Sequence, residues 1–216
     1  MHKFADKIEE HADELITLEC EDNGKPYADA AKDCGFSSLL MRYYGGKAMD
    51  IKGMSSMRDS FGNFNNSYAY TRKEPVGVCG LITPWNYPML MSAFKIGPML
   101  ASGCTGVSKV PELAPLSSMR MIELWNEIEG VVPGVLNCLP GIGNEAGEAI
   151  VDHPGVRKIA FTGSTEIGVR IQERSAKHMK RLNLELGGKG PLVVFEDADI
   201  KKAIATAAAT SMINSG

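Results

Sequence analysis

Apolar residues recur every three or four positions in the first part of the chain. Between residues 4 and 18 this spacing predicts a helix, with Glu and Lys between the apolar positions. The run 23–26 (Asn-Gly-Lys-Pro) stops that helix, and a second amphipathic segment covers 27–44. Residues 50–66 are rich in Gly, Ser, Asn and Met without a period, which predicts a loop or an irregular extended segment. Alternation over 67–72 indicates one exposed strand.

Beyond Pro75 the pattern changes, because short apolar runs now alternate with amphipathic segments. The expected strands cover 76–82, 106–109, 135–139, 158–161, 182–186 and 192–195, and the expected helices cover 89–101, 116–128, 144–151, 165–176 and 200–213. This alternation predicts an α/β fold: an open parallel sheet of Rossmann-like type, covered by helices on both faces. We therefore expect a helical segment and extended excursion over 1–75 and a nucleotide-binding domain over 76–216.

Composition narrows the possible functions. With 23 Lys and Arg against 26 Asp and Glu, the net charge is −3 and the basic residues are scattered, so we expect no nucleic-acid partner. The most apolar stretch, 89–107, contains Lys95, Pro98 and three glycines, so we expect no membrane span. Five scattered cysteines indicate reduced thiols, and no pattern of Cys or His suggests a metal. We expect a cytoplasmic protein, with an organellar form left open.

Two polar segments follow the first two strands of the expected sheet. The segment 83–88 (Thr-Pro-Trp-Asn-Tyr-Pro) places the amide of Asn86 where it could donate hydrogen bonds to an oxyanion. The alternative is a turn bracketed by prolines, with Asn as a helix cap. After the second strand, Glu112 is placed to accept hydrogen bonds from the hydroxyls of an adenosine ribose. The alternative there is a solvated charge pair with Lys109.

Two later segments also carry candidate chemistry. In 161–168 a strand ends at a glycine turn and hydroxyl residues open a helix, whose free N–H groups could hold a pyrophosphate. Thr165 stands where the usual dinucleotide fingerprint has its central glycine, so a plain helix capped by Ser164 is the alternative. Glu185 lies inside an apolar strand before two glycines. We expect its carboxylate to be partly desolvated, with a raised pKa suited to a general base; the alternative is a structural carboxylate.

Together and in this order, these four segments resemble the aldehyde dehydrogenase superfamily. Flanking segments agree with the resemblance, namely 22–26, 74–78, 94–103, 133–137 and 140–141. It covers essentially the whole chain, which amounts to about half of a typical member. It implies that a cysteine attacks an aldehyde, that hydride passes to NAD(P), and that water then hydrolyses a thioester. Because a 2′-phosphate would bring like charge against the carboxylate of Glu112, we expect NAD rather than NADP. The resemblance also implies a homo-oligomer for the complete enzyme.

The resemblance implies a role for each matching residue. Asn86 would donate to the oxyanion, and Glu185 would activate the water that hydrolyses the thioester. Lys109 and Glu112 would bind the adenosine ribose, and Thr162 would lie near the nicotinamide. The complete set expected to bind the cofactor is Thr83, Pro84, Trp85, Lys109, Glu112, Thr162, Gly163, Ser164 and Gly168.

One departure from the family concerns the nucleophile. In the family it follows a motif that begins like 214–216 (Asn-Ser-Gly), two residues before the cysteine, and none of the five cysteines here stands at that place. We therefore expect a fragment that is inactive alone. The alternative is a nucleotide-binding or assembly protein without catalysis. A short-chain dehydrogenase lacks support, because its Tyr-x-x-x-Lys pair occurs only at Tyr43 and Lys47, far from any cofactor loop.

Overall fold

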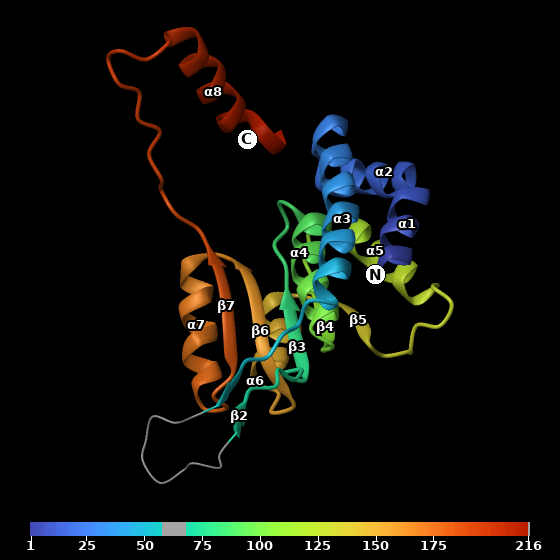
Figure 1. Cartoon of the computed structure of the whole chain (residues 1–216). Helices are drawn as coiled ribbons and strands as arrows, with labels where there is room; N and C mark the ends of the chain where they lie inside the picture. The colour runs from blue at the N-terminus through green and yellow to red at the C-terminus, as the bar shows by residue number, and fades with distance from the viewer. Residues whose placement is uncertain (58–67, 216) are drawn as a thin grey trace.

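The computed structural model describes residues 1–57 and 68–215, and it begins with three helices (Figure 1). These are α1 (His2–Glu10), α2 (Ala12–Asn23) and α3 (Tyr27–Ala48). The single helix that the spacing predicts over the first part is two helices, because His11 leaves helical geometry at φ −105° and ψ 20°. Gly24 ends α2 in the left-handed region at φ 82°, where a side chain would be strained. The predicted stop at 23–26 is thereby confirmed.

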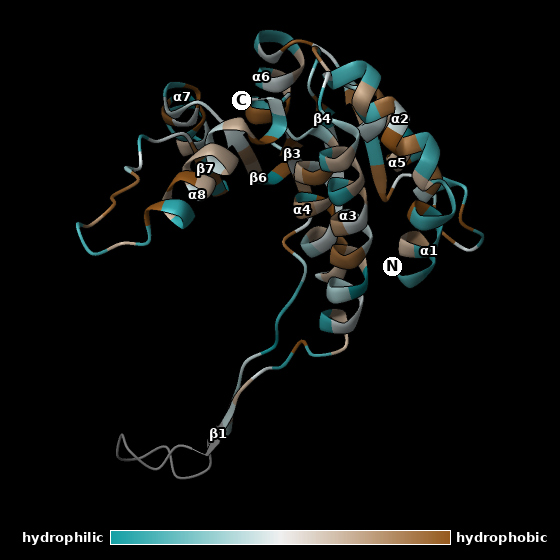
Figure 2. Cartoon of the chain, turned by 90° about the horizontal axis from the view of Figure 1, so that it is seen from above, coloured by the Kyte–Doolittle hydropathy of each residue, from teal (hydrophilic) through white to brown (hydrophobic). Residues whose placement is uncertain are grey.

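A two-stranded arm separates these helices from the main sheet. Strand β1 (Ser55–Met57) pairs antiparallel with β2 (Tyr68–Tyr70), and Figure 2 shows the arm projecting away from the rest of the chain. The exposed strand predicted over 67–72 is confirmed at 68–70, whereas 71 and 72 lie beyond its end and 67 lies outside the described residues. Strand β1 falls within 50–66, for which the sequence predicts a loop or an irregular extended segment, and 58–66 lies outside the described residues.

The rest of the chain builds a five-stranded parallel sheet, so the predicted α/β fold is confirmed. Its strands run in the order β5-β4-β3-β6-β7, and each neighbouring pair is parallel. The order reverses between β3 and β6, since β4 and β5 extend to one side and β6 and β7 to the other. The strands are β3 (Val78–Ile82), β4 (Thr105–Val110), β5 (Leu136–Pro140), β6 (Val156–Gly163) and β7 (Arg181–Leu186), and the intervening helices are α4 (Pro88–Ala101), α5 (Leu116–Asn126), α6 (Glu148–Asp152) and α7 (Thr165–Ala176).

Hydrophobic clusters lie on both faces of this sheet, as the near-continuous apolar strands require. On one face α4 and α5 pack with the N-terminal helices behind them, so that Leu81 and Ile96 share a buried cluster with Phe4. On the other face α6 and α7 contribute Ile150 and Ile171 to a second cluster. The first cluster spans both parts of the chain, and the division at residue 75 into two domains stays a prediction.

After β7 the chain leaves the sheet (Figure 1). The strand predicted over 192–195 is wrong: these residues form no strand and are 47% to 72% exposed. An apolar run becomes a strand only where a neighbouring strand can pair with its backbone, and the described residues place none there. Helix α8 (Ile200–Met212) follows as predicted. In the described ranges, no helix has the length and apolar character needed to cross a membrane.

Candidate functional site

A pocket of about 350 Å³ opens at the carboxyl ends of β3, β4 and β6, where the strand order reverses. Parallel sheets bind ligands at such a reversal, because the loops on either side diverge and leave a crevice. The structure brings eight of the predicted cofactor-binding residues together on its wall. They are Thr83, Pro84 and Trp85 after β3, Lys109 and Glu112 at the end of β4, and Thr162, Gly163 and Ser164 at the end of β6.

Gly168, the ninth predicted residue, does not line this pocket. It lies one turn into α7, where an added Cβ would stand 2.5 Å from the side chain of Leu186 on β7. The absence of a side chain therefore allows helix and strand to pack closely, and this packing sets the position of the helix start at Ser164.

Lys109 and Glu112 form an ion pair on the pocket wall, with 2.7 Å between Nζ and Oε2. The Lys109 side chain is 5% exposed, whereas that of Glu112 is 43% exposed. The ammonium of Lys109 holds the pKa of Glu112 below its ordinary value. Glu112 is therefore a carboxylate at neutral pH, half open to the pocket, with lone pairs left to accept hydrogen bonds from hydroxyls. The alternative of a solvated charge pair therefore holds for the carboxylate of Glu112 and fails for Lys109, which is buried.

The start of α7 faces the same pocket. Ser164 caps the helix, since its Oγ accepts a hydrogen bond of 3.3 Å from the backbone N–H of Ile167. A helix start also carries N–H groups without intrahelical partners and a partial positive charge, which together suit a phosphate. The capped helix and the phosphate site are thus compatible. Sequence reasoning missed Arg170 and Arg174, which reach the pocket wall from α7 and pair with Glu148 of α6.

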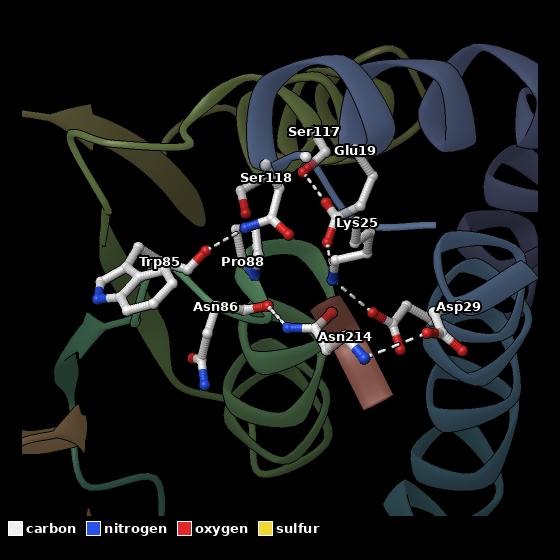
Figure 3. A network of polar contacts seen from close by, with 12 residues as sticks. Glu19, Lys25, Asp29, Trp85, Asn86, Pro88, Ser117, Ser118 and Asn214 are labelled. Atoms are coloured by element: carbon white, nitrogen blue, oxygen red, sulfur yellow. Dashed lines mark hydrogen bonds and ion pairs between the residues drawn. The ribbon is translucent and has the colours of Figure 1, made fainter. Parts of the chain in front are cut away.

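Asn86 lies in the loop between β3 and α4 but not on the pocket wall. It is half-buried, and its backbone oxygen accepts a hydrogen bond of 2.7 Å from Nδ2 of Asn214. Figure 3 shows its side-chain amide pointing away from Asn214. The neighbouring Trp85 is 59% exposed and forms part of the pocket wall.

Glu185, at the carboxyl end of β7, lies beside Thr162 in the strand register. The prediction of a partly desolvated carboxylate is wrong here: the side chain is exposed, and Oε1 accepts a hydrogen bond of 3.1 Å from Nδ2 of Asn183. The physical reason is that β7 is an edge strand, so its sequence pattern overstates its burial. Glu185 lines a second cavity, of about 750 Å³, on the α4 side of the sheet.

Lys95 of α4 lines this second cavity and was missed as a functional candidate. Its Nζ donates a hydrogen bond of 2.6 Å to Oγ1 of Thr162, a residue that lines both cavities. Burial lowers the pKa of Lys95 to about 8, and the charge of Glu185 acts in the opposite direction. The sequence does hold a signal for this residue, because Lys95 is the one charged residue within the apolar helix α4. Over the described ranges, no cluster of His, Cys, Asp and Glu could hold a metal.

Burial raises the pKa of four of the five cysteines, and Cys104 is the exception. None lines the first pocket. Burial raises the pKa of Cys34 and Cys138 to about 11, and that of Cys79 to about 12. Because the thiolate is the reactive form, these three thiols are nearly inert at neutral pH. At Cys104, on the wall of the second cavity, burial raises the pKa, but hydrogen bonds with Ser102 and with the backbone outweigh burial and lower it.

Comparisons with known proteins agree with this geometry. Residues 1–216 match the aldehyde dehydrogenase family. The chain is 48% identical over 217 residues to the putative aldehyde dehydrogenase DhaS of Bacillus subtilis (strain 168), covering 100% of this chain and 43% of that protein. It is 45% identical to betaine aldehyde dehydrogenase 1 of Oryza sativa subsp. japonica, covering 99% of this chain and 42% of that protein.

Solved structures agree as well. An NAD+ complex of aldehyde dehydrogenase from Bacillus cereus superposes with a TM-score of 0.93 at 46% identity, over 99% of this chain and 42% of that one. An E. coli NADP dependent enzyme superposes with a TM-score of 0.92 at 36% identity, over 98% of this chain and 43% of that one. The chain thus spans 42% to 43% of the length of these four relatives.

Proposed function

We propose that this chain, which belongs to the aldehyde dehydrogenase family, is the cofactor-binding portion of an enzyme that oxidises an aldehyde to a carboxylic acid with NAD. The observation that carries the proposal is the pocket where the strand order reverses, with three loops converging on it. Its volume lies within the range of small-molecule sites, and its polar groups are few and distinct in chemistry.

The residues present fit a dinucleotide. Glu112 offers a carboxylate to the ribose hydroxyls, and the start of α7 at Ser164 offers N–H groups to the phosphates. Thr162, which lies between the two cavities, would stand beside the nicotinamide. The bound cofactor would supply the hydride acceptor of the reaction.

The chain's own residues would divide the remaining work. The amide of Asn86 would donate a hydrogen bond to the oxyanion that forms when a thiol adds to the aldehyde. Glu185 would take a proton from the water that hydrolyses the thioester, and its exposure leaves it free to move toward that water. Lys95 would hold the side chain of Thr162 in place through its hydrogen bond to Oγ1.

The covalent step needs a thiolate beside the bound aldehyde and cofactor, and none of the five cysteines of this chain lies on the wall of the pocket. We therefore assign that step to a residue of the whole protein other than these five. We expect residues 1–216 alone to bind cofactor without oxidising aldehyde, and we propose that the whole protein acts as a cytoplasmic homo-oligomer. A nucleotide-binding protein without catalysis, the alternative, would share the pocket and lack the turnover.

Glu112 supports a preference for NAD over NADP. The 2′-phosphate of NADP would bring negative charge against a carboxylate that is ionised at neutral pH. Lys109 lies within 2.7 Å of that carboxylate and would soften the repulsion. We therefore propose a preference and not an exclusion.

Calorimetric titration of NAD and NADP into the protein and its Glu112→Gln variant tests the proposal. Losing a charged acceptor should weaken NAD binding by about tenfold and narrow the gap between the two cofactors. Glu173→Gln, an equal charge change at an exposed position of α7, serves as the matched control and should leave both affinities unchanged. Equal affinity for NAD and NADP, with no effect of Glu112→Gln, would remove Glu112 from the site.

A further inference from the structure

The loop that carries Trp85 and Asn86 is held from behind by the turn between α2 and α3. Nδ2 of Asn23, the last residue of α2, donates a hydrogen bond of 2.6 Å to the backbone oxygen of Trp85. Nζ of Lys25, in the turn itself, lies 4.7 Å from the centre of the Tyr87 ring. The last residue of α2 and a residue of the following turn thus hold the carbonyl before Asn86 and the side chain after it.

Lys25 is fixed by a buried network of charges (Figure 3). Its Nζ donates hydrogen bonds of 2.7 Å to Oε1 of Glu19 and to Oδ2 of Asp33, and its own side chain is 0% exposed. Ser117 of α5 donates to the other oxygen of Glu19. Burying three charges gives little net stability, because desolvation offsets much of their attraction. What such a network provides is a single position for the ammonium against the Tyr87 ring.

The same turn and the start of α3 also hold residues 214 and 215 against this loop. The side chain of Asn214 donates to the backbone oxygen of Asn86, while its backbone N–H donates to Oδ2 of Asp29 at 3.2 Å. Oγ of Ser215 donates to the backbone oxygen of Gly24 at 3.3 Å. The loop is therefore fastened from two sides by groups outside the nucleotide pocket.

We propose that Asn23 and Lys25 are positioning residues, which set the backbone of the loop and thereby aim the Trp85 ring at the pocket and the Asn86 amide at the reacting carbonyl. The loop is short and bracketed by Pro84 and Pro88, so displacement at the Trp85 carbonyl passes directly to its neighbour. The aim of the Asn86 amide at the reacting carbonyl rests on the proposed function, whereas the position of the loop is independent of that function.

Asn23 is the residue to test, because Lys25→Met would leave Glu19 and Asp33 buried without a cation and risk unfolding. Asn23→Ala removes the donor, and Asn23→Asp removes it while keeping the size of the side chain. Asp22→Asn is the matched control: this neighbour's Oδ2 accepts a hydrogen bond of 2.8 Å from the N–H of Leu116 on α5, not from the loop.

The intact protein is labelled with 5-fluorotryptophan and followed by ¹⁹F NMR without cofactor. Of the two tryptophans in residues 1–216, Trp85 is 59% exposed in the loop and Trp125 is 8% exposed in the core, and Trp85→Phe assigns the Trp85 signal. Both Asn23 variants should shift or broaden the Trp85 signal and leave Trp125 in place. Asp22→Asn should leave the Trp85 signal unchanged. An unmoved Trp85 signal in both Asn23 variants, or an equal change in Asp22→Asn, would overturn the proposal.

NAD titration of the same proteins separates this inference from the proposed function. Loss of one hydrogen bond behind the pocket wall should weaken NAD binding by about 2- to 10-fold in the Asn23 variants, and by less than about twofold in Asp22→Asn. A wild-type protein that binds no NAD, with a Trp85 signal that responds only to the Asn23 changes, would support the positioning role and contradict the proposed function. Normal NAD binding with an unmoved Trp85 signal in the Asn23 variants would support the proposed function and contradict the positioning role.

Discussion

Lys95→Met should make the protein more stable at neutral pH. The lysine is 8% exposed, and burial lowers its pKa from 10.5 to about 8. At 1.36 kcal/mol for each pKa unit, keeping this ammonium charged in the folded state costs about 3 kcal/mol. Methionine removes the cost and fills similar space, but it also removes the hydrogen bond to Thr162, which contributes about 1 kcal/mol. The expected net gain at pH 7 is therefore about 2 kcal/mol.

This gain must depend on pH in one direction. Below about pH 8 Lys95 is protonated in both the folded and unfolded states, so its full cost is present. Between pH 8 and 10.5 the unfolded state binds more protons, so the wild-type protein gains stability as the pH rises. Urea unfolding at pH 7, 8.5 and 10 measures the difference, with exposed Lys201→Met as the control. A gain that stays constant from pH 7 to 10 would refute the reasoning.

Three further outcomes are expected. In the whole enzyme, Glu185→Gln should keep an initial burst of NADH followed by slow turnover, whereas Asn86→Ala should lower the rate of the burst by about 10²–10³. Stopped-flow absorbance measures both, and an equal loss of burst and turnover in the two variants would contradict separate roles. Gly168→Ala should lower the free energy of unfolding by about 1–3 kcal/mol, because its Cβ would stand 2.5 Å from a leucine side chain. The control Gly35→Ala, in open space on α3, should raise this free energy by about 0.5–1 kcal/mol. Thermal unfolding that shows the same change in both variants would count against the packing argument. With its pKa raised to about 12, Cys79 should react with a disulfide reagent at pH 8 only on unfolding, and rapid labelling of the native protein would show that the thiol is accessible.

Local pattern was sufficient for the parallel sheet and for most of the pocket. Apolar runs separated by amphipathic segments leave few other folds, because each strand must be covered by helices on both faces. In a parallel sheet the carboxyl ends of all strands meet at one edge. Polar residues that follow different strands, such as Trp85, Glu112 and Ser164, therefore converge without any knowledge of side-chain contacts.

Burial and long-range partners were decided only by the tertiary structure. Glu185 and Lys95 both lie in apolar surroundings in the sequence, yet the edge position of β7 leaves Glu185 exposed while α4 buries Lys95 against Thr162. The apolar run 192–195 forms no strand, because pairing needs a neighbour that the sequence does not name. The hydrogen bond from Asn23 to Trp85 joins residues 62 positions apart. Desolvation and such contacts depend on what the fold brings alongside each group, which no local pattern of residues contains.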